Sequence, residues 1–225
     1  MQPELQILDD PATEAAARLV AANGHVVLTG GSTPRGAYEL AAERRPDWTD
    51  TELWFTDERA VGPEHEFSNY GMVKAALLDR VRTGPVHRMR GELGPHEGAA
   101  EYAGEYELAG SPHFDLVLVG LGPDAHVCSL FPGDDALSEI ERPVVGVDTP
   151  GMAPLLPRIT LTLPVVNAAA EVLVLVKGED KADAVARAFS GRPDPRAPGS
   201  LLRPTSGTLT VLLDPAAAAR LEAAR

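Results

Sequence analysis

The stretch HVVLTGGSTPRGAYEL, His25 to Leu40, changes character at its two adjacent glycines. The apolar run HVVLT has the composition of a short buried strand, and from Pro34 onward the spacing of Ala37 and Leu40 is helical. Gly30 to Thr33 is therefore predicted to be the turn of a strand–turn–helix unit. Repeated units of this kind build sheets whose strands run parallel.

The same alternation of apolar runs and helical spacing recurs along the chain. Predicted strands are 52–56, 114–120, 172–177 and 209–214, and predicted helices are 11–23, 69–81, 95–109, 181–189 and 215–225. This order predicts one α/β domain over residues 1–225, a doubly wound and mostly parallel sheet with helices on both faces. The segment RITLTLP, 158–164, alternates like a half-exposed strand and is the expected antiparallel member, while the Pro-rich stretch 191–199 is a predicted loop.

The composition indicates a folded globular protein and disfavours several classes of partner. Hydrophobic residues make up 44% and charged residues 24%, and the formal net charge of -13 repels nucleic acid and anionic membrane surfaces. Cys128 is the single cysteine, so an intrachain disulfide is excluded. The N-terminal residues lack the pattern of a secretion signal, and apolar runs are too short for a membrane helix, which together favour the cytoplasm.

In open α/β sheets, ligands bind beyond the carboxyl ends of the strands, so the loops at those ends are the candidate site. In the first loop Gly30 and Gly31 allow a close backbone approach, Ser32 and Thr33 add hydroxyl groups, and the following helix start favours an anion. The loop is interpreted as a phosphate cradle, although it matches neither the Walker pattern nor G-x-G-x-x-G. A turn that needs glycine only for its backbone angles explains this loop alone equally well.

Three basic residues and one acidic residue lie at further strand ends. Arg59 and Arg158 can hold phosphate in a bidentate way, Lys177 adds a point charge, and Asp57 can orient a hydroxyl or a histidine. Solvated charged loops are the ordinary explanation for such residues. Their common position at strand ends, in an acidic chain, favours a ligand site instead.

The segment GLGPDAHVCSLFPG, 120–133, places a histidine next to a carboxylate directly after a buried strand. His126 is therefore the candidate general base, with Asp124 close by in sequence. Cys128 is expected to be a buried, inert thiol rather than a nucleophile. No metal-ligand spacing is present, so no metal ion is expected.

Six blocks of the chain, in order, resemble the 6-phosphogluconolactonases of the glucosamine-phosphate isomerase/lactonase superfamily. They are LTGGSTP, WFTDERAV followed by SNYGM, HRMRGE, FDLVLVGLGPDAHVCSLFPG, PRITLTLPVVNAA and VLVLVKGEDKADAV, and they span 28–185. The resemblance implies a hydrolase without a cofactor or an obligate protein partner. Its substrate would be 6-phospho-D-glucono-1,5-lactone, a phosphorylated sugar lactone of the oxidative pentose phosphate pathway.

The resemblance also implies roles for the candidate residues. His126 would activate water for attack on the lactone carbonyl, with Asp57 or Asp124 orienting its ring. The loop Gly30 to Thr33 would hold the phosphate or the developing oxyanion together with the basic side chains Arg59, Arg158 and Lys177. The family usually has Asp-Gly-His where this chain has Ala125 between Asp124 and His126. A positive φ at that position would strain the alanine by roughly 1 kcal/mol or more.

Two other functions compete with the lactonase. Glucosamine-6-phosphate deaminases of the superfamily resemble D-G-H-x-A-F-N-E-P at this stretch, with a glutamate where this chain has Phe131, which cannot transfer protons. The other alternative is a sugar-phosphate sensor that binds its ligand without turnover. The sensor is disfavoured because the chain leaves no room for a DNA-binding segment and keeps the His126, Asp124 and Asp57 set.

Overall fold

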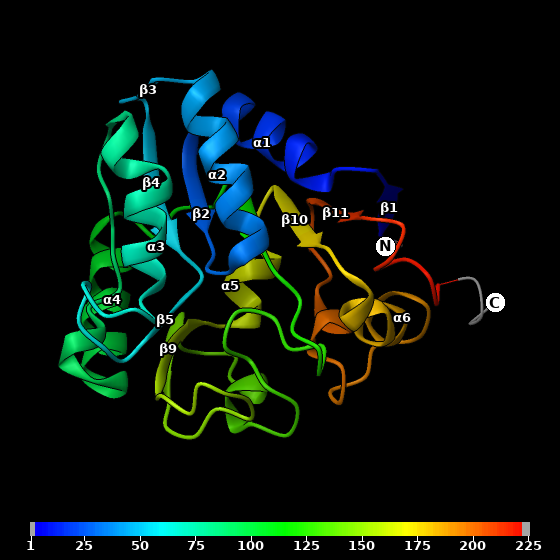
Figure 1. Cartoon of the computed structure of the whole chain (residues 1–225). Coiled ribbons are helices and arrows are strands. Elements are labelled where there is room, and N and C mark those ends of the chain that lie inside the picture. The colour runs from blue at the N-terminus through cyan, green and yellow to red at the C-terminus, as the bar shows by residue number, and fades with distance from the viewer. Residues whose placement is uncertain (1–2, 222–225) are drawn as a thin grey trace.

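A six-stranded parallel sheet forms the centre of the computed structural model, which describes residues 3–221 (Figure 1). The strand order is β1-β11-β10-β7-β2-β4, and every neighbouring pair runs parallel. The strands are β1 (Glu4–Ile7), β2 (Gly24–Leu28), β4 (Thr51–Phe55), β7 (Leu116–Val119), β10 (Glu171–Val176) and β11 (Thr208–Leu213). The predicted doubly wound α/β fold is confirmed, and five of these strands, all except β1, follow predicted apolar runs.

A smaller antiparallel sheet lies beyond the end of β4. It consists of β5 (Asp57–Arg59), β9 (Arg158–Leu161) and β8 (Val144–Val147), in the order β5-β9-β8. The antiparallel direction predicted for RITLTLP is correct, but its predicted half exposure is wrong, because all four residues of β9 are buried. Packing of helix α4 (Pro95–Leu108) against β8 and β9 covers this strand. The short strands β3 (Asp47–Trp48) and β6 (Arg82–Thr83) pair separately.

The other helices are α1 (Pro11–Ala21), α2 (Ser32–Arg44), α3 (Asn69–Ala76), α5 (Leu163–Asn167) and α6 (Ala182–Phe189). Helix α2 begins two residues before Pro34, and the helix predicted over 69–81 ends at Ala76, followed by a separate turn of 3-10 helix, Leu78–Arg80. The predicted helix 215–225 is wrong over 215–221, where the chain forms successive turns, and its remainder lies outside the described residues. The carboxylate of Asp214 fixes the first turn by accepting from the N–H groups of Ala217 and Gly178.

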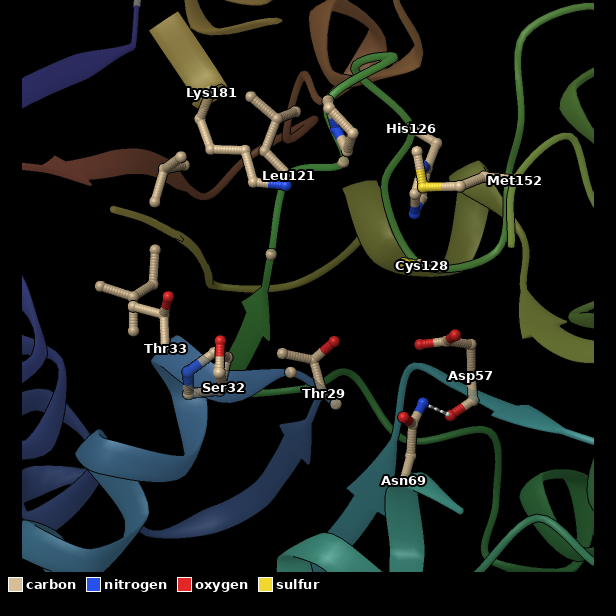
Figure 2. A pocket seen from close by; sticks show the side chains of 18 of the residues that line it. Thr29, Ser32, Thr33, Asp57, Asn69, Leu121, His126, Cys128, Met152 and Lys181 are labelled. Atoms are coloured by element: carbon tan, nitrogen blue, oxygen red, sulfur yellow. Dashed lines mark hydrogen bonds between the residues drawn. The ribbon is translucent and has the colours of Figure 1, made fainter. Parts of the chain in front are cut away.

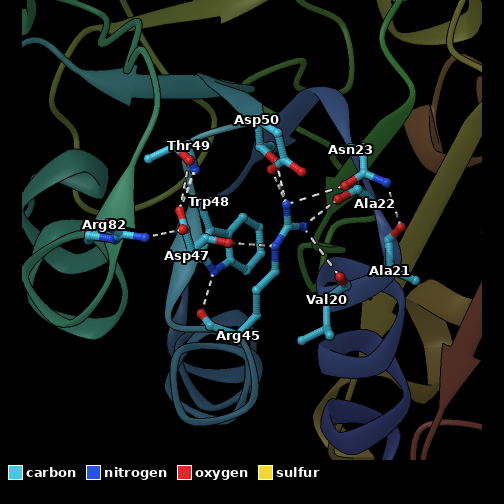
Figure 3. A network of polar contacts seen from close by, with 11 residues as sticks. Val20, Ala21, Ala22, Asn23, Arg45, Asp47, Trp48, Thr49, Asp50 and Arg82 are labelled. Carbon is cyan, nitrogen blue, oxygen red and sulfur yellow. Dashed lines mark hydrogen bonds and ion pairs between the residues drawn. The ribbon is translucent and has the colours of Figure 1, made fainter.

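Arg45, just after α2, ties two helix ends to the edge of the sheet (Figure 3). Its guanidinium carbon lies 4.5 Å from the centroid of the Trp48 ring, and the side chain is only 12% exposed. Its hydrogen-bond partners are the carbonyls of Val20, Ala22 and Asp47 and the side chains of Asn23, Asp50 and Thr51. One side chain therefore stabilises the junction of α1, α2 and β4.

The strand order changes direction between β2 and β7. From β2 the chain moves outward to β4, and from β7 it moves the other way, to β10 and then β11. The connections that follow β2 and β7 therefore diverge at their carboxyl ends and leave a crevice there. The topology places the loops after these two strands on either side of the expected ligand site.

Candidate active site

A cavity of about 260 Å³ opens at the carboxyl ends of β2, β4, β7 and β10, where the topology leaves its crevice (Figure 2). The segments that follow each of these four strands contribute to its wall. The predicted site residues that line it are Gly30, Gly31, Ser32, Thr33, Asp57, Arg59, His126, Arg158 and Lys177. Asp124 is outside this lining and lies behind His126, to which it is hydrogen-bonded.

The glycine loop needs each of its glycines for a different physical reason. Gly31 has a φ of 116°, which favours glycine. A Cβ on Gly30 would overlap the side-chain amide of Asn69, with its Nδ2 only 2.9 Å away. Immediately afterwards α2 begins at Ser32, so the free N–H groups of its first turn lie at the cavity wall. This arrangement is a ready anion site.

His126 is held by Asp124 through a hydrogen bond between Nδ1 and Oδ1 of 2.5 Å. Burial alone would raise the pKa of Asp124, but the hydrogen bond and the charge of His126 outweigh it and lower that pKa. An ionised Asp124 only accepts, so the proton of neutral His126 resides on Nδ1. Nε2 is then the lone-pair nitrogen, and no described residue is hydrogen-bonded to it. Of the two carboxylates proposed to orient the ring, Asp124 is the one that contacts it.

The turn that carries His126 is strained at two residues other than glycine. Ala125 has a φ of 69° and Cys128 a φ of 53°. Ala125 therefore has the positive φ that would strain an alanine at this position, and this left-handed backbone costs about 1 kcal/mol or more. The carbonyl of Ala125 accepts from Gly199 at 2.8 Å, while the N–H of Gly122 donates to the carbonyl of His126 at 2.9 Å. These bonds hold the turn in place despite the strain.

The thiol of Cys128 lines the cavity but is unsuited to nucleophilic attack. Burial, together with the nearby charge of Asp57, raises its pKa well above the ordinary value. The sulfur therefore stays protonated at neutral pH.

Asp57 is a buried carboxylate at the cavity wall, 5% exposed, with hydroxyl partners of its own. Ser129 Oγ donates to its Oδ2 at 2.7 Å, and Thr56 Oγ1 donates to its Oδ1 at 2.8 Å. Asn69 Nδ2 donates to its backbone carbonyl at 2.9 Å. Asp57 is thereby fixed as an acceptor that faces the cavity.

Arg59 and Arg158 lie opposite each other in the β5–β9 register and both line the cavity. Arg158 is 4% exposed, and burial, followed by repulsion from Arg59, lowers its pKa. Its Nε and Nη2 donate only to the backbone carbonyls of Leu156 and Pro154. Nε of Arg59 is buried without a hydrogen-bond partner among the described residues. Nη1 of Arg59 donates to the carbonyl of Phe67 and to Oδ1 of Asn69, and the nearby charges of Asp57 and Glu58 partly offset the repulsion at Arg158. Two adjacent guanidinium groups at the cavity wall, one with an unpartnered Nε, still favour an anion between them.

Lys181 also lines the cavity and was not predicted from the sequence. It lies four residues beyond Lys177, at the end of the 3-10 turn Glu179–Lys181 that follows β10. Its Nζ is 3.8 Å from a carboxylate oxygen of Asp180. The 3-10 turn brings the side chain of Lys181 back to the carboxyl end of β10. The spacing of the two lysines in KGEDK, 177–181, could have indicated this position. Other unpredicted lining residues include Thr29, Asn69 and Met152.

The described residues contain no helix with the length and apolarity needed to cross a membrane. Within the same residues, no three His, Cys, Asp or Glu side chains gather in a way that would hold a metal ion.

A histidine base with a free Nε2, in a cavity surrounded by cationic side chains and a helix start, suits acid–base chemistry on a small anion. The fold and the cavity thus define an α/β enzyme for phosphorylated metabolites. More specifically, the chain belongs to the family described as glucosamine-6-phosphate isomerases/6-phosphogluconolactonase, whose match spans residues 6–211.

Individual relatives support this membership. The chain is 40% identical to a 6-phosphogluconolactonase of Streptomyces coelicolor, with 93% of this chain and 90% of the relative covered. It is 38% identical to the human 6-phosphogluconolactonase, with 85% and 73% covered. Among solved structures, a 6-phosphogluconolactonase from Trypanosoma cruzi superposes with a TM-score of 0.85 at 27% identity, covering 98% of each chain.

Proposed function

We propose that this chain is a single catalytic domain that hydrolyses 6-phospho-D-glucono-1,5-lactone to 6-phosphogluconate. The observation that carries the proposal is the Asp124–His126 pair, which leaves Nε2 of the imidazole facing a cavity rich in anion-binding groups. Relatives named for this reaction are 36% to 40% identical to the chain over the aligned residues. The proposed setting is the oxidative pentose phosphate pathway in the cytoplasm.

In the proposed first step, Nε2 of His126 takes a proton from water while the water oxygen attacks the lactone carbonyl carbon. The resulting imidazolium is stabilised by Asp124, which stays ionised and keeps the ring oriented. In the second step the tetrahedral intermediate collapses, the bond from carbon to the ring oxygen breaks, and His126 returns its proton to that oxygen. The carboxylic acid formed then loses its own proton to solvent.

The anionic parts of the substrate have two candidate locations in the cavity. One is the start of α2, where Ser32 and Thr33 lie near Lys177 and Lys181 in the cavity wall. The other is the pair Arg59 and Arg158. One location would hold the phosphate and the other the developing oxyanion or a sugar hydroxyl.

The proposal is tested by stopped-flow hydrolysis of freshly generated lactone, read as acid release above the uncatalysed background. The His126→Ala variant is expected to lose about a hundredfold or more in kcat/KM, because a positioned general base contributes on that scale. Asp124→Asn is the companion variant, expected to lower kcat by disturbing the tautomer and orientation of the ring. Wild-type protein that binds 6-phosphogluconate without accelerating hydrolysis would refute the lactonase and favour a sensor.

A further inference from the structure

Phe131 contacts both His126 and Arg158, yet the proposed mechanism gives it no role. The centroid of its ring lies 4.6 Å from the centroid of the His126 imidazole, with 43° between the ring planes. The guanidinium carbon of Arg158 lies 6.0 Å from the centroid of the same phenyl ring. Phe131 is 2% exposed and is outside the cavity lining, so it meets the substrate only through its neighbours.

The phenyl ring is itself held by a small apolar cluster. Its buried members are Leu130, Phe131, Ala136, Val145 and Val147, with Leu137, Met152 and Leu163 packed around them. Val147 lies on β8 directly beside Arg158 in the β8–β9 register. A Cβ on Gly151 would meet the Phe131 ring at 3.7 Å, which shows how closely the backbone of that loop approaches. The ring is thus fixed relative to the small antiparallel sheet.

His126 and Arg158 depend on this ring to different degrees. Arg158 has two further attachments, its hydrogen bonds to the carbonyls of Pro154 and Leu156. The imidazole of His126 has one side-chain hydrogen bond, from Nδ1 to Asp124, which fixes one atom but not the plane of the ring. The tilted phenyl ring that packs beside the imidazole supplies the missing restraint.

We infer that Phe131 is a positioning residue for lactone hydrolysis: its ring sets the plane of the His126 imidazole and hence the direction of Nε2. The inference rests on the proposed function, because the direction of Nε2 matters only if that nitrogen is the base. Loss of the ring is expected to lower kcat more than it raises KM, since Arg158 keeps its other two attachments.

The test compares Phe131→Leu with Val145→Ala, a matched variant in the same apolar cluster that belongs to neither contact pair. Both changes should lower the thermal midpoint of unfolding. Phe131→Leu is expected to reduce kcat about 10- to 100-fold, as for a misplaced catalytic group, with KM changed less than threefold. Val145→Ala should keep wild-type kcat at a temperature where it is folded. Phe131→Tyr retains the flat ring and should recover most of the lost kcat.

An NMR measurement reports on the ring directly. The Hε1 signal of His126 feels the ring current of Phe131 in the wild type, and it should shift and broaden in Phe131→Leu but not in Val145→Ala. Equal kcat values for the two folded variants, or an unchanged imidazole signal, would overturn the inference. Failure of the lactonase proposal itself would be seen separately, as wild-type protein without activity.

Discussion

Replacing Gly122 by alanine is expected to disable the active site although no catalytic side chain is itself substituted. A Cβ at this position would lie 2.7 Å from Oδ1 of Asp124 and nearer still to Nδ1 and Cε1 of His126. Carbon contacts are comfortable only near 3.5 Å or more, so the imidazole must retreat by about 1 Å or more. The backbone of Gly122 does not require glycine, because its φ is not in the left-handed region. The methyl group therefore displaces the side-chain pair rather than unfolding the chain.

A displacement of this size corresponds to a loss of about a hundredfold in kcat/KM, or about 2.7 kcal/mol in the activation barrier. The assay is stopped-flow lactone hydrolysis, with circular dichroism and a thermal melt to show that the variant is folded. Gly104→Ala is the matched control, because a Cβ there meets nothing within 4 Å and lies in helix α4. It should retain full activity and gain roughly 0.5–1 kcal/mol of stability from helix propensity. Activity of Gly122→Ala within threefold of wild type would refute this account of how His126 is positioned.

Four further outcomes are expected. Arg45→Ala should lower the free energy of unfolding by about 2–4 kcal/mol in urea titrations, with kcat unchanged. Arg45→Lys should recover less than half of the lost stability, because a single ammonium cannot reproduce the guanidinium contacts. A fully stable Arg45→Ala variant would contradict this. The hydrogen bond from Arg88 lowers the pKa of Glu92 to about 2, so Glu92→Gln should lower the free energy of unfolding by at most about 1 kcal/mol at neutral pH. This difference in stability should hold above pH 4.5 and fade toward pH 2. A difference in stability that stays constant with pH would argue against the ion pair. Ala125→Gly should change the free energy of unfolding by less than about 1 kcal/mol, because relief of backbone strain and loss of a buried methyl group nearly cancel. The variant should keep kcat within twofold of wild type. A large fall in kcat would mean that the methyl group itself positions His126. With Phe131 where a proton-transferring glutamate would be needed, ammonia release from glucosamine 6-phosphate should be negligible beside lactone hydrolysis, and comparable rates would exclude this reading of the site.

Much of the central sheet could be predicted from the sequence because its inner strands are covered on both faces. All four residues of β7 are buried, and so are five of the six in β10, which leaves continuous apolar runs that are hard to miss. The strand β5 has no such signal. Its three residues, Asp57–Arg59, are all charged, and it exists as a strand only through pairing with β9, far along the chain.

The candidate site shows the same division. The Asp124–His126 contact was predictable because the two residues are neighbours in sequence and a tight turn brings their side chains together. One of the two hydroxyl partners of Asp57 is Ser129, 72 residues away, and only the tertiary fold brings the two together. Lys181 was not predicted because it follows the strand end by several residues, and only the 3-10 turn Glu179–Lys181 brings it to the cavity. The predicted terminal helix is not formed over 215–221, although the carboxylate of Asp214 accepts from the N–H of Ala217 as an N-cap residue does.

The position of β1 at one edge of the sheet has a consequence for how the chain is made. Its pairing partner is β11, so residues 4–7 pair with residues 210–213, which lie 206 positions later in the chain. At roughly 5–20 residues per second, synthesis leaves the N-terminal strand without its partner for about 10 to 40 seconds. During that interval Leu5 and Ile7, both still exposed in the finished fold, are available to other nascent or folded chains. The edge strand β1 therefore completes its pairing only after β11 has been made.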